Sequence, residues 1–484
     1  MTTGHNFWDA GAWSLMIELT ILLVGMLVAN MLRRLIKPLR QSLIPSSVLG
    51  GFLILFANLA YEKITGDSVF SKVTMETLTY HGLGLGFVAM ALRQPQKNRD
   101  KKTNAAVFNA GVTTVSSYLL QGILGLAITA GLFFALGNWP ASGLLLPMGY
   151  GQGPGQAYNW GHVYETATAY APFQYGGSFG LALAAMGFVS ASVGGVIYLN
   201  RMKKKGQIDQ SIVNAEEMEN LSAETITEKG EIPLSESLDK LTVQIGLVVL
   251  TYMAAYLVMY GVSLGLDQLG GFFTTTVKPL IWGFNFLIGT VMAILVRNVL
   301  NGLTRRGRRQ YINNFMLARI SGVMFDIMVV ASIAAIDLSA FSHREFIIPM
   351  VVICVVGAVA TYYQLRFIAR RLYPDYPHEA FLSLYGMLTG TASTGVILLR
   401  EIDPMFKTPA ATNLVYQQLW AIVFGFPMLL LLGYAPIGLT VDPATTSLNN
   451  IWITLAALAG LFIAMNLILF RKQLFGRKKG KQAS

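Results

Sequence analysis

Long apolar stretches alternate with short polar ones along nearly the whole chain. Most of the apolar stretches reach roughly 20 residues, enough for a helix to cross a hydrocarbon core about 30 Å thick. The pattern predicts eleven membrane-spanning helices, at residues 12–32, 45–62, 77–92, 106–136, 173–199, 241–266, 275–297, 314–338, 346–369, 409–432 and 449–470. The first stretch is too long for a signal-peptide core and no basic residue precedes it, so we expect it to remain as a helix.

Composition agrees with lipid as the main solvent of this chain. Hydrophobic residues make up 54% of it, charged residues make up 13%, and the mean hydropathy is +0.52. Soluble domains carry about 25% charged residues. The single cysteine, Cys354, lies within a predicted span, so it excludes an internal disulfide and is expected to be a small core residue.

The basic residues collect in alternate connecting segments. Of the 36 Lys and Arg, 31 lie in segments that eleven spans place on one side of the membrane. These segments are 33–40, 93–102, 201–240, 297–309, 366–371, 400–407 and the tail from Arg471. Because basic segments stay on the cytoplasmic side, we expect a cell inner (plasma) membrane protein with its N-terminus outside and its C-terminus in the cytoplasm. The net charge of +11 is then explained by topology, and no nucleic-acid partner is expected.

One segment near the middle is polar throughout. Residues 203–240 hold nine of the 25 acidic residues, which predicts a cytoplasmic linker. The predicted parts are a first transmembrane repeat at 1–202, the linker, a second repeat at 241–440, and a further helix with a basic tail at 441–484.

The two halves share an order of features. Pro45 opens a span in the first half and Pro279 opens one in the second, and each half has five spans with an irregular stretch between the fourth and fifth. Since five is odd, the second half enters the membrane the other way up. The expected fold is therefore all-α, with two five-helix inverted repeats and one extra C-terminal helix, an architecture that many secondary transporters use.

The irregular stretches are GYGQGPGQ at 149–156 and TGTASTG at 389–395. Irregular backbone at membrane depth survives only inside a protein or beside a wet cavity. Counting sides makes residues 141–165 a re-entrant hairpin from outside and residues 380–400 one from inside, so their tips can meet. The alternative is that these small residues only pack helices closely.

Such tips suit an anion and a cation together. Helix N-termini offer unpaired N–H groups and partial positive charge to an anionic substrate, while carbonyl and hydroxyl oxygens suit a dehydrated sodium ion. The predicted substrate-binding residues are Gly151, Gln152, Gly153, Gly155, Gln156, Gly390, Thr391, Ser393 and Thr394. The predicted sodium ligands are Thr389, Thr391 and Asp326.

The order IPSSVLGG, GLGLGFVAMAL, GYGQGPGQAYNW and GTASTG resembles the bacterial sodium/glutamate symporter family, from about Ile44 to Pro436. The resemblance implies paired five-helix repeats with re-entrant loops and sodium-coupled uptake of a dicarboxylic amino acid. It carries over Gly151, Gly153 and Gly155 of the first tip, and Gly390 and Thr394 of the second. The chain departs from the family at Gln152 and Pro154, and at Thr391 to Ser393, and these departures affect the identity of the substrate.

We therefore expect a sodium-coupled symporter that imports an acidic amino acid, with glutamate first, by alternating access. A homodimer is expected, with sodium as the coupling ion and no other cofactor. Two alternatives remain, a sodium/proton antiporter that uses Asp326 and an ion channel whose GYG acts as a carbonyl filter. No nucleophile, base and orienting group recur together, so no enzyme is expected.

Other polar groups within the spans have simpler interpretations. Asp326 either neutralises sodium, carries a proton or pairs with a neighbouring helix. Arg319, on the same predicted helix, is expected to extend towards the membrane surface. Glu18 is expected to make a polar contact with another helix, and Tyr80 and His81 to lie near the outer interface.

Overall fold

The computed structural model describes residues 8–94, 101–206, 239–271, 273–305, 311–404, 407–442 and 444–475, and within them it is helical and has no strand. Most of the predicted linker lies outside these ranges. The first half contains α1 (Ala10–Leu35), α2 (Lys37–Gln41), α3 (Ser46–Thr65), α4 (Lys72–Leu92), α5 (Lys101–Leu136), η1 (Ser142–Leu145), η2 (Met148–Gln152), α6 (Pro154–Glu165) and α7 (Gly176–Lys204). The second half contains α9 (Lys240–Leu269), η5 (Phe273–Val277), α10 (Lys278–Gly283), α11 (Asn285–Arg305), α12 (Asn314–Ala334), η6 (Leu338–Ser342), α13 (Arg344–Leu372), α14 (Pro377–Thr389), α15 (Ala392–Arg400), α16 (Ala410–Tyr416) and α17 (Gln418–Tyr434), followed by α18 (Asn449–Leu469) and α19 (Arg471–Phe475).

Each of the eleven predicted spans coincides with a helix or a pair of helices. Among the described residues, nine helices are long and apolar enough to cross a membrane, and the pair α16–α17, bent by 48°, makes a tenth. The predicted span 275–297 is divided between α10 and α11. The remaining one, α4, is too polar to qualify because Thr, His, Glu and glycine residues interrupt its apolar run. The chain is a multi-pass, all-α membrane protein.

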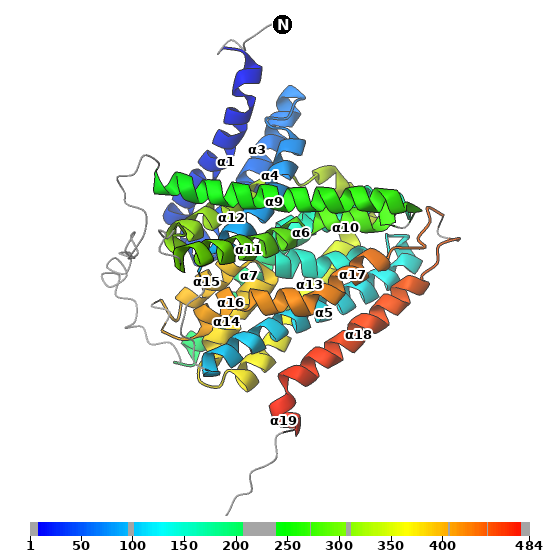
Figure 1. The fold of residues 1–484 in the computed structure, drawn as a ribbon. Helices are drawn as coiled ribbons and strands as arrows, with labels where there is room; N and C mark the ends of the chain where they lie inside the picture. Colours follow the sequence, from blue (N-terminus) through cyan, green and yellow to red (C-terminus); the bar gives the residue numbers. More distant parts are fainter. Residues whose placement is uncertain are drawn as a thin grey trace, which may run out of the picture.

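The two halves pack against each other reciprocally. In the first half α1 packs on α3, and in the second α9 packs on α11. Across the halves α3 meets α12 while α4 meets α11, and α7 meets α13 while α5 meets α17. The pairs α4–α12 and α5–α13 also join the two halves, whose helices are interleaved in Figure 1. Helix α18 stands outside it and packs on α5.

Small residues explain the closeness of α4 and α12. A Cβ atom on Gly82 would lie 3.0 Å from the Met328 side chain, and one on Gly86 would lie 2.5 Å from the Phe325 ring. The Ser321 hydroxyl donates a hydrogen bond of 3.0 Å to the carbonyl of Gly86. The GLGLG run therefore lets two central helices approach without a side chain between them.

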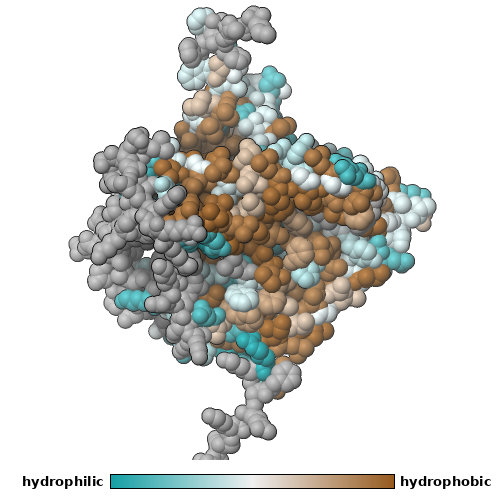
Figure 2. Space-filling view, in the orientation of Figure 1, coloured by the Kyte–Doolittle hydropathy of each residue, from teal (hydrophilic) through white to brown (hydrophobic). Residues whose placement is uncertain are grey.

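The surface is apolar between two polar ends. In Figure 2 an apolar band covers the helices that run across the view in Figure 1, and hydrophilic patches lie at both ends of it. At the basic end, where α7 and α13 finish with arginines, the Asn301 side chain donates to the Gln94 side chain at 3.0 Å and joins α11 to α4. At the opposite end, Lys72 pairs with Asp337 at 3.2 Å and joins the start of α4 to the segment after α12. Connecting segments that the sequence predicts to lie on the same side of the membrane are thus in contact with each other.

Candidate functional site

The first irregular stretch is built from three short elements. A 3₁₀ turn, η1, and a π turn, η2, lead to Gly153, and α6 begins directly after it with Pro154 at its first position. Gly153 has a φ of 89°, a left-handed conformation that glycine adopts without strain. Proline suits the first turn of a helix, where its missing N–H would have no partner. The elements span 142–165, close to the predicted hairpin.

The second irregular stretch is a pair of helices. Helices α14 and α15 pack against each other and are separated only by Gly390 and Thr391. A Cβ atom on Gly386 would lie 2.7 Å from the Cα of Gly395, so the two helices are in backbone contact there. The pair spans 377–400 and contains the predicted hairpin at 380–400.

The two tips meet at one cavity. A Cβ atom on Gly153 would lie 3.3 Å from the Thr391 side chain. A cavity of about 410 Å³ is lined by Gly151 and Gln152 of the first tip and by Thr391, Ala392 and Ser393 of the second. Both α6 and α15 begin here, and neither has a side chain capping its N-terminus. Their first N–H groups are thus directed at the region where the tips join.

Helix α5 holds both tips in place. The Tyr118 hydroxyl donates a hydrogen bond of 3.0 Å to the carbonyl of Gly151. One turn further on, the Gln121 amide donates to the carbonyl of Leu388 at 2.9 Å, just before the second tip. Because both bonds are buried, they fix the position of each tip relative to the same helix.

The predicted site residues divide into two groups. Those that line the cavity are Gly151, Gln152, Thr391, Ser393 and Asp326. Those that lie behind its wall are Gly153, Gly155, Gln156, Gly390, Thr394 and Thr389. The Thr389 hydroxyl donates within its own helix to Tyr385 at 2.7 Å, so the structure does not bring it to the cavity with Thr391 and Asp326.

Asp326 presents a carboxylate to this cavity. Its side chain is exposed there and has no ion-pair partner among the described residues. The hydroxyl of Ser47, at the start of α3, is its hydrogen-bonding neighbour. This contact with α3 agrees with the predicted alternative of an anion paired with a neighbouring helix, while the sodium and proton roles of Asp326 stay predictions. No group of three or more His, Cys, Asp or Glu could hold a metal in that part. A sodium ion would depend on hydroxyls, carbonyls and Asp326.

Two buried amides lie on α6 just below the tip. Gln156 and Asn159 are 1% and 4% exposed, and none of their four amide nitrogen and oxygen atoms has a hydrogen-bond partner among the described residues. Leaving such a group without a partner costs about 1–3 kcal/mol. These amides therefore have unused binding capacity within two helical turns of the tip.

Several residues of the cavity were not predicted. They are Asn30 of α1, Pro45, Ser46 and Ser47 of α3, Tyr118 of α5 and Gln418 of α17. The IPSSVLGG stretch marked the repeat but was not assigned to the site. Tyr118 and Gln121 carried a usable signal, since two polar side chains three residues apart share one face of an apolar helix.

The other interpretations can be compared with the contacts. Glu18 accepts a hydrogen bond of 2.9 Å from the Ser71 N–H at the start of α4, which confirms the predicted contact with another helix. Cys354 is 2% exposed, which confirms a core residue. The Arg319 guanidinium lies over the ring of Phe315, 5.0 Å from its centre. His81 contacts the Tyr252 hydroxyl at 3.1 Å.

The geometry defines a class, a multi-pass helical membrane protein with a cavity between two broken segments, mostly apolar in lining but with a few polar groups at the tips. No family model, curated protein or solved structure matches the chain. The function is therefore argued from the site.

Proposed function

We propose that this protein is a sodium-coupled secondary transporter that imports an acidic amino acid, with glutamate as the first substrate to test. The observation that carries the proposal is the meeting of two broken segments, one from each half of the chain, at one cavity. Broken helices at a repeat interface are the usual binding site of secondary transporters.

The chemistry of the cavity suits an amino dicarboxylate with a sodium ion. The N-termini of α6 and α15 favour carboxylates. The hydroxyls of Thr391 and Ser393 and the carboxylate of Asp326 favour a cation. Bound sodium would also offset the net negative charge of the substrate. Substrate and sodium should therefore each tighten the binding of the other by the same factor.

The reciprocal packing of the halves supports an inverted repeat. Exchanging the halves maps the pair α3–α12 onto α11–α4, and α7–α13 onto α17–α5. Together with the odd number of predicted spans per half, this favours two opposed re-entrant hairpins. The basic segments favour a cytoplasmic C-terminus in an inner (plasma) membrane. We also propose a homodimer. In it, the helices that carry the hairpins move relative to a dimeric scaffold.

One observation keeps a second candidate open. Asp326 faces the cavity and has no ion-pair partner among the described residues, which is what a proton carrier in a sodium/proton antiporter requires. The channel alternative has less support. A carbonyl filter needs free carbonyls, but the Gly151 carbonyl accepts from Tyr118. The Tyr150 side chain is also occupied, because its hydroxyl donates to the Cys354 carbonyl at 2.8 Å.

The test is uptake of radiolabelled L-glutamate by purified protein in liposomes. We expect accumulation when sodium is higher outside, and none when sodium is equal on both sides or replaced by potassium. Aspartate, citrate and malate are added as competitors. Equal uptake with and without the sodium gradient would reject the coupling. A competitor that displaces glutamate at lower concentration would change only the substrate.

A further inference from the structure

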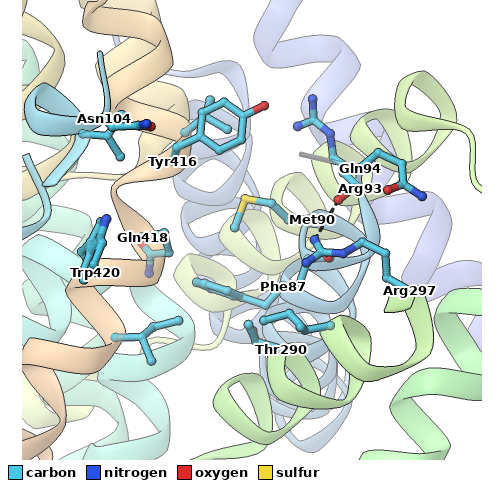
Figure 3. Close-up of a pocket in the computed structure, with 15 residues that line it drawn as sticks. Phe87, Met90, Arg93, Gln94, Asn104, Thr290, Arg297, Tyr416, Gln418 and Trp420 are labelled. Atoms are coloured by element: carbon cyan, nitrogen blue, oxygen red, sulfur yellow. Dashed lines mark hydrogen bonds between the residues drawn. The ribbon is translucent and has the colours of Figure 1, made fainter. Parts of the chain in front are cut away.

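A second cavity lies at the basic end of the molecule. It has a volume of about 530 Å³ and separates the end of α4 and the middle of α11 from the start of α5 and the junction of α16 and α17 (Figure 3). It shares Phe87, Met90 and Gln418 with the tip cavity, so the two spaces adjoin at these side chains. A cavity of about 610 Å³ at the opposite end shares no lining residue with the tip cavity.

Arg297 of α11 is the fixed cation of this second cavity. Its guanidinium Nη1 donates to the carbonyls of Ala91 and Arg93 at the end of α4, each at 2.9 Å. Carbonyls at a helix C-terminus carry partial negative charge, which holds the guanidinium in place. In Figure 3 the guanidinium lies across the cavity from Asn104 and Trp420.

The charge of the lining residues has one sign. Arg93 and Arg297 both line the cavity, and no Asp or Glu does so among the described residues. Gln94, Asn104, Thr290, Tyr416 and Gln418 supply the other polar groups. A cleft lined by one sign of charge concentrates ions of the other sign.

We propose that this cavity is the entrance to the tip site from the basic end, and that Arg297 makes it selective for small organic anions. The inference rests on the proposed function in taking the tip cavity as the substrate site. Phe87 and Met90 form an apolar neck between Arg297 and the N-termini of α6 and α15. An anion thus passes between two electropositive positions, and the neck supplies no carboxylate to a cation of similar size.

The first experiment measures anion preference without any transport. Asn104 is exposed and lines the cavity, and Cys354 is buried, so Asn104→Cys allows a bimane dye to be attached there. Iodide and neutral acrylamide are compared as quenchers in purified, detergent-solubilised protein. We expect Arg297→Gln to lower the iodide quenching constant about twofold or more and to leave acrylamide unchanged. High salt should remove the difference, since it screens the charge.

The control removes a charge at the same end but outside the cavity. Arg371 is exposed near the end of α13, and Arg371→Gln should leave iodide quenching as in the parent. Because Arg297 also stabilises the end of α4, Arg297→Lys provides a folded comparison that keeps the charge, and it should retain the iodide preference. Equal quenching in Arg297→Gln and Arg371→Gln, or equal loss in Arg297→Lys and Arg297→Gln, would overturn the inference.

A second experiment links the entrance to the tip site. In inside-out vesicles, we expect Arg297→Gln to raise the half-saturating concentration of L-glutamate about tenfold relative to Arg371→Gln. An unchanged value would overturn the role of Arg297 in substrate entry. Absence of glutamate transport in the unmodified protein would reject the proposed function, while iodide quenching would still decide whether the cavity selects anions.

Discussion

Gly153 combines two constraints at the point where the tips meet. Its positive φ disfavours any side chain, and a Cβ would press on Thr391. We expect Gly153→Val to abolish transport while the protein still inserts in the membrane, because the change is confined to the tip. The measurement is sodium-driven uptake normalised to the amount of folded protein.

The matched control for this change is Gly131→Val. Gly131 lies in α5, and a Cβ there has nothing within 4 Å. Uptake by this variant should remain near that of the parent. Normal uptake by Gly153→Val would mean that the glycine serves only close packing.

Asp326 separates the symporter from the antiporter. If it helps to bind sodium, Asp326→Asn should weaken sodium affinity by about tenfold or more, because a full charge facing the ion is lost. No sodium-driven proton movement is expected in either protein. The checks are sodium titration of glutamate binding and a pH-sensitive dye inside liposomes. A proton signal in the parent that disappears in Asp326→Asn would favour the antiporter.

At the scale of residues, the sequence predicted residues of the two tips but not the residues of other helices that contact them. Gly151, Gln152, Thr391, Ser393 and Asp326, which line the cavity, could be selected from the sequence because polar groups and a glycine-rich break interrupt long apolar runs there. Thr389 was grouped with them, but it ends α14 and its hydroxyl donates to the Tyr385 carbonyl of the same helix. Which residues of a distant helix reach a tip depends on packing, which a single sequence does not specify.

At the scale of elements, α5 acts as a common support for both tips. Tyr118→Phe removes the hydroxyl that bonds the Gly151 carbonyl and keeps the ring that packs on this glycine. We expect the loss of this hydrogen bond to reduce the free energy of glutamate binding by about 1 kcal/mol, which corresponds to roughly fivefold weaker binding. Isothermal titration in the presence of sodium measures it.

Tyr164→Phe is the control for this substitution. The Tyr164 hydroxyl is also buried and donates to a carbonyl, that of Leu432, at 2.9 Å. Both variants should lose similar thermal stability, but only Tyr118→Phe should bind glutamate more weakly. Equal affinities in the two variants would show that α5 does not act on the tips.

The contact of α4 with the segment before η6 predicts a pH dependence. Burial would raise the pKa of Asp337, but hydrogen bonds from Ser339 and the charge of Lys72 hold the pKa below its ordinary value. A depressed pKa stabilises the fold above the unfolded value of about 3.9, and the gain disappears as the pH falls through the folded value. Because the pair is partly exposed, its contribution is small.

We therefore expect Asp337→Asn to lower the melting temperature by about 1 °C between about pH 5 and pH 8. The difference from the parent should close below about pH 4. Thermal unfolding followed by tryptophan fluorescence at several pH values measures it. A difference that persists unchanged at pH 3 would contradict this account.

Helix positions were predictable where the apolar run alone decides them. The predicted 12–32 and 449–470 lie within or close to α1 and α18. The predicted 275–297 was wrong as a single helix, because the helix is interrupted at Phe284 between α10 and α11. An average of hydropathy over about 20 residues does not detect an interruption of one residue.

At the scale of the whole molecule, the sides of the connecting segments can be tested. Thr168, between α6 and α7, and Lys407, between α15 and α16, are both exposed, and Cys354 is buried. We expect Thr168→Cys to react with an impermeant maleimide from outside intact cells, and Lys407→Cys only in inside-out vesicles. The unmodified protein is the background. Reaction of both cysteines from the same face would contradict the prediction that the two hairpins enter the membrane from opposite sides.

The order of helices follows from the sequence, but their pairing does not. Apolar length and basic segments predict where the chain turns, since both depend on local composition. The contact of α3 with α12, across nearly 300 residues, depends on which surfaces fit together. Glycines such as Gly82 indicate a close contact between helices, but the sequence does not specify which helix makes the contact.

The reciprocal packing of the halves also predicts a second conformation of the protein, in which the entrance is at the opposite end. If the halves are inverted copies, exchanging their conformations carries α4, α11, α5 and α16–α17 onto α12, α3, α13 and α7. An entrance at the opposite end would then open between the end of α12 and the start of α7. These are now joined by the Asp337 N–H, which donates to the Ser178 hydroxyl at 3.0 Å, and Asp337 also pairs with Lys72. A disulfide between Ser178→Cys and Asp337→Cys, which spans this junction, should therefore lock the molecule facing one side, stopping turnover while leaving Asn104→Cys reactive, and reduction should restore transport.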